Sequence, residues 1–318
     1  FNIVDNYKSK KSNEKNTLTH LFSKFQMDLS YENFIESSLD FSFQKVNNDT
    51  YLKVFDTNIV NTDLKPNNFD TLTSDIDLNL ENENFSLNMG FTAYEDLSKS
   101  NSDRYQYVLP YYDFSTSFFN NNNFASFNFV SQGDNILKDT NSLRSRMINN
   151  LDIQSYGYFS ENGFKNNFNY YLKNTISAGK NNTEYDSSPH VKFMNIFELV
   201  SSFPLISISD KYSSFLDPKI SLRLNPSDMK NYKNENRQIS NDNLFNINRL
   251  GLIDTLESGN NLTLGLDFKR ENIDNINKYF EFKLGKVLRT KNNSNLPTNS
   301  TLDKKNSNYF GKVTNTFN

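Results

Sequence analysis

The stretch LTLGLDFK, residues 262–269, decides the fold. Apolar side chains occupy Leu262, Leu264, Leu266 and Phe268, while Thr, Gly, Asp and Lys fill the positions between them. Successive residues of a β-strand point to opposite faces of a sheet, so strict alternation indicates a strand with one apolar face and one polar face. We therefore expect this segment to be a strand of an antiparallel sheet.

The same alternation recurs along most of the chain. It appears around residues 39–43, 76–80, 85–91, 112–118, 191–199, 220–224 and 280–284. No sustained apolar stripe of helical spacing accompanies it. Polar clusters such as 120–123, 161–163 and 180–183 separate these segments, and longer polar stretches fall at 226–243 and 291–308. The sequence predicts an all-β protein of roughly fourteen antiparallel strands.

Alternation alone fits both a soluble β-sandwich and a membrane β-barrel. Three features favour the barrel: extended segments of roughly 10–15 residues, full charges on the polar faces, and aromatic side chains near strand ends. A mean hydropathy of −0.71 does not oppose this interpretation, because only every second strand residue faces lipid. The mostly apolar segment 197–208 is too interrupted to span a membrane as a helix. A sandwich and a solenoid remain less favoured alternatives.

Composition argues against several functions. The net charge of −3 gives no electrostatic case for nucleic-acid binding. The chain has no cysteine and only two histidines, His20 and His190, which are far apart. No nucleophile, phosphate-binding or metal motif is present in the sequence. We therefore expect a protein that is not an enzyme and that needs no cofactor or metal.

Three segments are more specific than their surroundings. Residues 46–56 suggest a polar turn leading into a strand that begins at Tyr51. Residues 104–114 contain Pro110 within an extended run, which suggests a β-bulge or a strand start. The third, residues 241–266, carries a spaced set of distinctive side chains, which are Phe245, Asn248, Arg249, Asp254, Gly259, Asn260, Thr263 and Gly265.

This third segment resembles the hallmark run of the LptD family of lipopolysaccharide-assembly outer-membrane proteins. Leu250 departs from the family's Phe, Gly251 lies one position early, and Thr255 replaces an Arg. The other two segments, together with residues 217–222 and 296–308, resemble further parts of the same barrel, so that the likeness covers most of residues 45–318. The resemblance implies that residues 1–318 are the middle portion of the barrel domain. The family's periplasmic jellyroll and its first and last barrel strands would then lie outside the chain, leaving the barrel incomplete.

The resemblance also implies a function. Such a barrel would be an integral outer-membrane translocon that inserts lipopolysaccharide into the outer leaflet without covalent chemistry. Its partners would be lipopolysaccharide, the plug lipoprotein LptE, the periplasmic bridge protein LptA and membrane lipid. Within this picture we expect Asn248, Arg249 and Asp254 to fix a loop over the barrel lumen.

Two alternatives belong to other classes. A porin or nutrient receptor would also be an outer-membrane barrel, but it would need a plug domain or a constriction loop. A secreted β-rich adhesin would show the same alternation and would be soluble without detergent.

Overall fold

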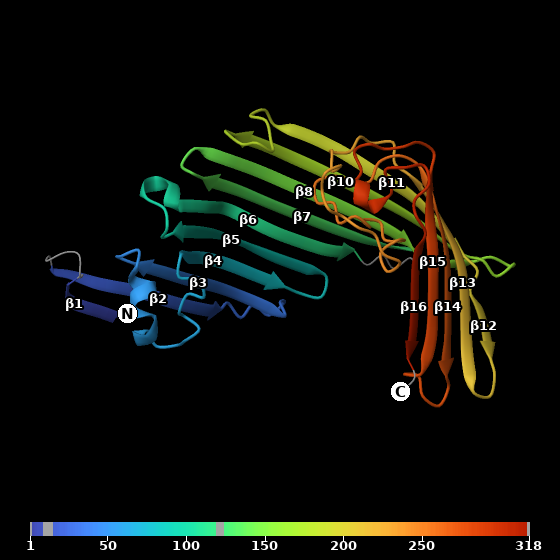
Figure 1. Ribbon diagram of the computed structural model, residues 1–318, viewed down its shortest axis with the longest axis horizontal. Helices are drawn as coiled ribbons and strands as arrows, with labels where there is room; N and C mark the ends of the chain where they lie inside the picture. Colours follow the sequence, from blue (N-terminus) through green and yellow to red (C-terminus); the bar gives the residue numbers. More distant parts are fainter. Residues whose placement is uncertain (1, 9–14, 119–123, 317–318) are drawn as a thin grey trace. The chain divides into compact units, whose positions relative to one another are not determined.

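The computed structural model describes residues 2–8, 15–118 and 124–316. Within them, a sheet of 16 strands follows the order β1-β2-β3-β4-β5-β6-β7-β8-β10-β11-β13-β14-β15-β16, with β9 paired to β10 and β12 paired to β13 (Figure 1). All strand pairs of known register are antiparallel. The predicted all-β class is confirmed, and the main path contains the roughly fourteen strands expected.

The strands vary in length from two to sixteen residues. The first eight are β1 (Asn2–Lys8), β2 (Lys15–Asp28), β3 (Glu36–Val46), β4 (Thr71–Glu81), β5 (Phe85–Asp96), β6 (Tyr105–Phe118), β7 (Ala125–Lys138) and β8 (Ser142–Ser155). The remaining eight are β9 (Tyr158–Phe159), β10 (Lys165–Lys180), β11 (His190–Ser202), β12 (Leu205–Ile208), β13 (Tyr212–Leu224), β14 (Asn261–Asn272), β15 (Tyr279–Arg289) and β16 (Phe310–Thr316).

Helical structure in the described residues is short. It consists of α1 (Tyr51–Phe55) and the 3-10 turns η1 (Asp56–Asn58), η2 (Asn101–Arg104) and η3 (Thr298–Ser300). Among these helices none is long and apolar enough to cross a membrane.

The chain divides into two compact units. Unit 1 comprises residues 1–117, 130–149 and 176–191, and unit 2 comprises residues 118–129, 150–175 and 192–318. Each unit has its own buried apolar clusters.

In unit 1 the register keeps like side chains together on each face of the sheet. Phe41 pairs with Ile76, which pairs with Phe91 on the next strand, and all three are exposed. The adjacent position on the opposite face brings Asp40 opposite Asp77. One face of these strands is therefore apolar and the other is charged, as the alternation predicted.

The segment after β3 contradicts the sequence-based expectation. Tyr51 begins the short helix α1 and not a strand, and Tyr51 and Leu52 are buried against Leu18 and Phe22 of β2. The Tyr51 hydroxyl lies 2.9 Å from Nδ1 of His20. The prediction of a strand over residues 51–56 is wrong because this short apolar group packs on the end of the sheet and does not extend it.

Pro110 lies in a β-bulge. Gly90 pairs with Tyr111 and Thr92 pairs with Val108, so Leu109 and Pro110 together oppose the single residue Phe91. A proline cannot donate to a strand ladder, and a bulge removes that requirement. The sequence-based interpretation of this position as a bulge is confirmed.

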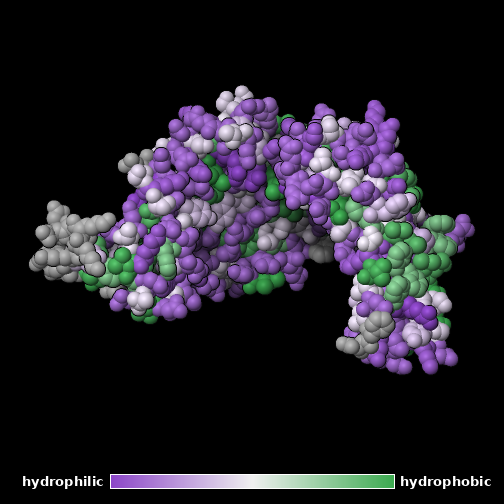
Figure 2. Space-filling view, viewed as in Figure 1, coloured by the Kyte–Doolittle hydropathy of each residue, from purple (hydrophilic) through white to green (hydrophobic). Residues whose placement is uncertain are grey.

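In unit 2 the strands β13 to β16 form a continuous ladder. Leu222 pairs with Leu262, which pairs with Leu288, while Arg223 pairs with Asn261, which pairs with Arg289. Leucines thus line one face of these strands, which is here called the outer face. The two arginines lie on the opposite face, here called the inner face. Where these strands lie, Figure 2 shows a hydrophobic band between hydrophilic ends.

Connections alternate in length along the chain. The connections at 47–70, 97–104, 225–260 and 290–309 are long, whereas the intervening ones at 29–35, 82–84 and 273–278 are short. The pattern is not uniform, since the turn at 139–141 is short although it falls among the long set, and the connections 156–164 and 203–211, which include β9 and β12, have nine residues each although they fall among the short set. Such alternation is typical of outer-membrane barrels, which have tight periplasmic turns and longer outer loops.

Candidate functional site

The connection between β13 and β14, residues 225–260, is here called the long connection. Together with residues 290–309 it lies at one end of β13–β16 (Figure 1). It folds back on the inner face of the sheet and forms a buried apolar cluster, which is Met229, Tyr232, Leu244, Leu250, Leu252, Val287, Leu296 and Leu302. A second cluster joins Leu256 to Met194 and Ile196 of β11. The candidate site is built on this packed loop.

Two glycines of the sheet make room for the loop. Phe245 lies over Gly265 of β14, where an added Cβ would be 2.6 Å from the aromatic ring. Leu244 lies in the same way over Gly285 of β15. The absent side chains let the long connection pack directly on the strands.

Arg249 is the most thoroughly bonded residue of the predicted set. It is 2 % exposed. Its guanidinium donates to both carboxylate oxygens of Glu257, at 2.7 and 2.6 Å, and to the Thr263 hydroxyl at 3.0 Å. It also donates to the Asn261 side chain and to the Leu244 carbonyl. Because Thr263 and Asn261 belong to β14, Arg249 joins the long connection to the sheet.

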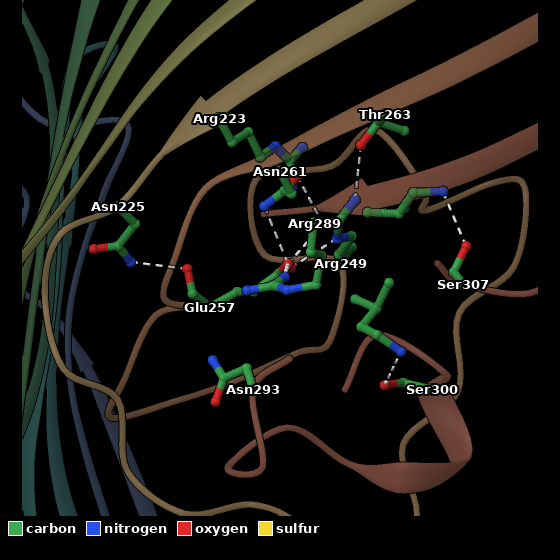
Figure 3. Close-up of polar contacts among 12 residues, drawn as sticks. Arg223, Asn225, Arg249, Glu257, Asn261, Thr263, Arg289, Asn293, Ser300 and Ser307 are labelled. Carbon is green, nitrogen blue, oxygen red and sulfur yellow. Dashed lines mark hydrogen bonds and ion pairs between the residues drawn. The ribbon is translucent and has the colours of Figure 1, made fainter. Parts of the chain in front are cut away.

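Glu257 accepts from a second arginine, Arg289 at the end of β15. Burial alone would raise the pKa of the Glu257 carboxyl, but the charges and hydrogen bonds of Arg249 and the charge of Arg289 outweigh burial, and the pKa falls to about 2. The carboxylate is therefore ionised at any physiological pH. Figure 3 shows Arg249 and Arg289 meeting at Glu257.

A third arginine, Arg223 of β13, binds the loop from the strand below. Its Nε donates to Glu198 of β11 at 2.6 Å, and its Nη2 donates to the carbonyls of Phe245 and Asn246. Both Arg223 and Glu198 are buried. Arg223, Arg249 and Arg289 with Glu198 and Glu257 are here called the arginine cluster.

Asn248 closes a tight turn within the long connection. Its side chain accepts from the Leu252 amide and donates to the Leu252 carbonyl, each at 2.8 Å. Gly251 lies inside the turn at φ +63 and donates its amide to the Asn248 carbonyl. Asn248 therefore fixes the direction in which the chain continues after Arg249. Both of these hydrogen bonds lie within the long connection.

Asp254 holds a different part of the loop. It accepts from Lys230 at 2.9 Å and from the Tyr232 hydroxyl at 2.5 Å. Partial burial raises the Asp254 pKa, but the bonds from Lys230 and Tyr232 lower it by more, whereas the pKa of Tyr232 is raised by burial and by its bond to Asp254. Asp254 thus joins the start of the long connection to its end.

Thr255 occupies the position at which the resemblance noted in the sequence implies an Arg. It is 1 % exposed, and its hydroxyl accepts from the Lys230 amide and contacts the Met194 sulfur. The small side chain packs into the loop against β11 where a guanidinium would need space and a counter-charge.

Gly259 and Asn260 end the long connection. Gly259 adopts φ +86 and donates its amide to the Asn225 carbonyl at 2.9 Å, which closes the loop at its base. The Asn260 carbonyl accepts from the Thr290 amide and so links the two connections. The left-handed conformation explains the requirement for glycine at 259.

The structure places Phe245, Asn248, Arg249, Asp254, Gly259 and Asn260 in the long connection and Thr263 and Gly265 in β14, and it does not bring them into one cluster. Arg249 lies in the arginine cluster, and Gly259 borders it, while Asn248 and Asp254 stabilise separate turns. Sequence reasoning missed four members, which are Arg223, Arg289, Glu198 and Glu257. Glu257 lay within the quoted run and could have been noticed as a counter-charge for Arg249. The others are ordinary polar-face residues until the register is known.

The arginine cluster holds the long connection against the sheet. Each of its carboxylates is bonded to a guanidinium, and in the part of the chain that the structure describes no group of three or more His, Cys, Asp or Glu could hold a metal ion. The geometry fastens a loop onto a sheet.

Comparison with known proteins gives one family. A model described as LptD, LPS transport system D, matches residues 18–318, which is most of the chain and includes the whole long connection. No curated protein matches the chain.

Proposed function

This chain belongs to the LptD family of outer-membrane lipopolysaccharide transport proteins, and from that premise we propose that it forms part of the barrel wall of a translocon that inserts lipopolysaccharide into the outer leaflet. The observation that carries the proposal is the family match over residues 18–318 on a sheet of alternating strands. The chain acts in lipopolysaccharide transport and assembly, and it is an outer-membrane protein. Insertion at the outer leaflet is the finer step that we propose.

The two faces of the sheet suit this function. Exposed apolar side chains such as Phe41 and Ile76 fit a face against lipid, and the opposite face carries carboxylates such as Asp40 and Asp77. Backbone groups in hydrocarbon need partners, which a closed ladder of strands supplies. We propose that residues 1–318 contribute one part of such a closed wall.

The long connection would lie over the lumen in this arrangement. Asn248, Arg249 and Asp254 would keep it folded, so that the passage of lipopolysaccharide sugars is controlled by a packed loop. The hydrogen bonds of these three residues stabilise the loop. The translocation that we propose requires no covalent step and no catalytic residue.

Specific partners follow from the same proposal. LptE would occupy the lumen against the polar strand faces, and LptA would deliver lipopolysaccharide from the periplasm. The family match favours a lipopolysaccharide translocon over a porin, a nutrient receptor or a secreted adhesin.

Depletion of the protein in its own cells tests the function. We expect lipopolysaccharide detected by antibody on intact cells to fall while the amount in permeabilised cells is maintained. Unchanged surface lipopolysaccharide after complete depletion would contradict the proposal. Re-expression of the unaltered protein should restore the surface signal, and this serves as the control.

A further inference from the structure

We propose that a polar pocket at one end of β4, β5 and β6 binds an uncharged sugar unit. The pocket has a volume of about 290 Å³ and lies within unit 1. The residues on which the argument depends are Thr71, Tyr94, Asp103, Gln106 and Lys138. The inference rests on the proposed function, because it takes the sugar to be part of the glycan of lipopolysaccharide.

Strand register places the pocket on the charged face of unit 1. The ladder between β4 and β5 has no shift, and it pairs Thr73 with Tyr94. Every second residue of a strand points to the same face, so Thr71 and Thr73 share the face of Asp77. Tyr94 lies beside them on β5, and Gln106 of β6 lies opposite Tyr94. The proposed function turns this face towards the lumen, into which the pocket would open.

The pocket lies at the ends of its strands. Asp103 belongs to the turn η2, in the connection between β5 and β6, and Lys138 is the last residue of β7. The connection at 97–104 is one of the long set, which the proposed function places outside the cell. The pocket is therefore positioned where a glycan would leave the lumen.

Several charged side chains around the pocket are already paired. Arg104 bonds to Asp49 at 2.8 Å and to Glu95 at 2.9 Å. Lys99 lies 3.7 Å from Asp139. These pairs fasten the connection at 97–104 to its surroundings, and they are not free to bind a ligand.

Five other side chains have no such partner. In the part of the chain that the structure describes, no hydrogen bond or ion pair engages the side chains of Thr71, Tyr94, Asp103, Gln106 and Lys138. Thr71 and Gln106 are half-buried, a position in which polar groups normally find partners. Convergent polar groups in a pocket are the usual feature of a ligand site.

The chemistry of these groups selects a sugar. A sugar hydroxyl both donates and accepts, and the amide of Gln106 does the same. Asp103 supplies a further acceptor and Lys138 a further donor, and their opposite charges leave no net attraction for a phosphate or a cation. The Tyr94 ring, 36 % exposed, offers an apolar surface to the C–H groups of the sugar.

A single introduced tryptophan tests the pocket, because the chain contains none. Tyr94→Trp keeps an aromatic ring in the pocket. Tyr107→Trp is the matched control, since Tyr107 follows Gln106 on β6 and so points to the opposite face. Each purified whole protein is titrated in detergent with the lipid-free oligosaccharide released from the cells' own lipopolysaccharide. We expect a saturable change in emission from Tyr94→Trp and none from the control.

Substitutions in the Tyr94→Trp protein identify the ligand class. Gln106→Ala should weaken binding about tenfold, the ratio given by the loss of ~1.4 kcal/mol of hydrogen bonding. Lys138→Met should weaken it as well, whereas Lys138→Gln keeps a donor without the charge and should bind as before. Raising the salt concentration to about 0.5 M should not change the affinity, because screening acts on charged ligands.

Folding is checked separately. The side chains of Gln106 and Lys138 hold no other part of the described structure, so heat-dependent electrophoretic mobility should be the same for all variants. If Tyr94→Trp does not fold, nuclear magnetic saturation transfer from the unaltered protein to the oligosaccharide replaces the emission, and Gln106→Ala should reduce it.

Equal responses from the two tryptophans, or binding that is unchanged by Gln106→Ala, would overturn the pocket. Loss of binding in Lys138→Gln and in high salt would overturn an uncharged sugar, because the occupant would then be an anion. A silent Tyr94→Trp in a protein whose depletion lowers surface lipopolysaccharide would defeat this inference alone. Depletion without effect on surface lipopolysaccharide would instead defeat the proposed function.

Discussion

Glu257 is the residue at which the long connection and the wall meet. Its carboxylate is bonded to Arg249 from the loop and to Arg289 from β15. Burying charges is costly unless they are paired, and removal of one partner leaves the other uncompensated. Predictions at the scale of residues therefore concern the loop and not the strands.

Arg249→Ala should release the long connection. The change removes bonds to Glu257, Thr263 and Asn261, and the loss of one partner from a buried pair costs about 3–5 kcal/mol. We expect faster proteolytic cleavage within residues 225–260, measured by mass spectrometry, and less surface lipopolysaccharide. Lys233→Ala, at an exposed position of the same loop, is the control. Equal cleavage rates for the two variants would refute a fastening role for Arg249.

The loop should also loosen in acid. The Glu257 pKa is lowered on folding, from 4.5 to about 2. Such a group stabilises the folded loop fully above pH 4.5, and this contribution, on the order of 3 kcal/mol, is lost as the pH falls towards 2. Cleavage by pepsin within residues 225–260 should therefore accelerate steeply between these values. Glu257→Gln cannot titrate and should be cleaved readily throughout. A wild-type profile as flat as that of Glu257→Gln would contradict the role of this carboxylate.

At the scale of elements, the strands could be predicted from the alternation of apolar and polar residues, whereas the helix α1 could not. Each alternating segment quoted at the outset lies in a strand, because the two-residue period is written locally in the sequence. Tyr51, Leu52 and Phe55 span less than two helical turns, too few to establish a helical period. Their packing against Leu18 and Phe22, distant in sequence, determines α1.

A pair of substitutions on β3 separates the two faces of the wall. Phe41→Arg places a charge on the apolar face and should cost about 2–4 kcal/mol in a bilayer. Ser42→Arg, one residue later, lies opposite Asp75 on the charged face and should cost little. Urea titration of the reconstituted protein measures both, and Leu264→Arg on β14 should behave like Phe41→Arg. Similar costs for Phe41→Arg and Ser42→Arg would exclude a lipid-facing surface here.

At the scale of the whole molecule, the alternation of long and short connections predicts which ends of the strands face the cell exterior. The chain has no cysteine, so a single introduced thiol reports its location. A membrane-impermeant maleimide should label Lys233→Cys on intact cells, whereas Asn275→Cys, in the short connection after β14, should react only after permeabilisation. Labelling of Asn275→Cys on intact cells would reverse the orientation.

The whole molecule also sets the limit of sequence reasoning about the site. Phe245 and Gly265 could be selected as distinctive residues, yet their contact could not be predicted, because it depends on how the loop folds back. Arg223 and Arg289 lie far apart in sequence and meet the same loop only through the pairing of each with Asn261. Register between strands is a property of the assembled sheet, so the arginine cluster emerges only from the structure.

The division of the arginine cluster between strands and loop restricts how the protein can be inherited or recombined. Two of its cations, Arg223 and Arg289, belong to the wall, while Glu257 belongs to the loop. A chimera that received a foreign loop without an acidic residue at this position would leave Arg289 of the wall buried without its counter-charge. Loop and wall must therefore be exchanged as one cassette, and substitutions at 249, 257 and 289 should be accepted together or not at all.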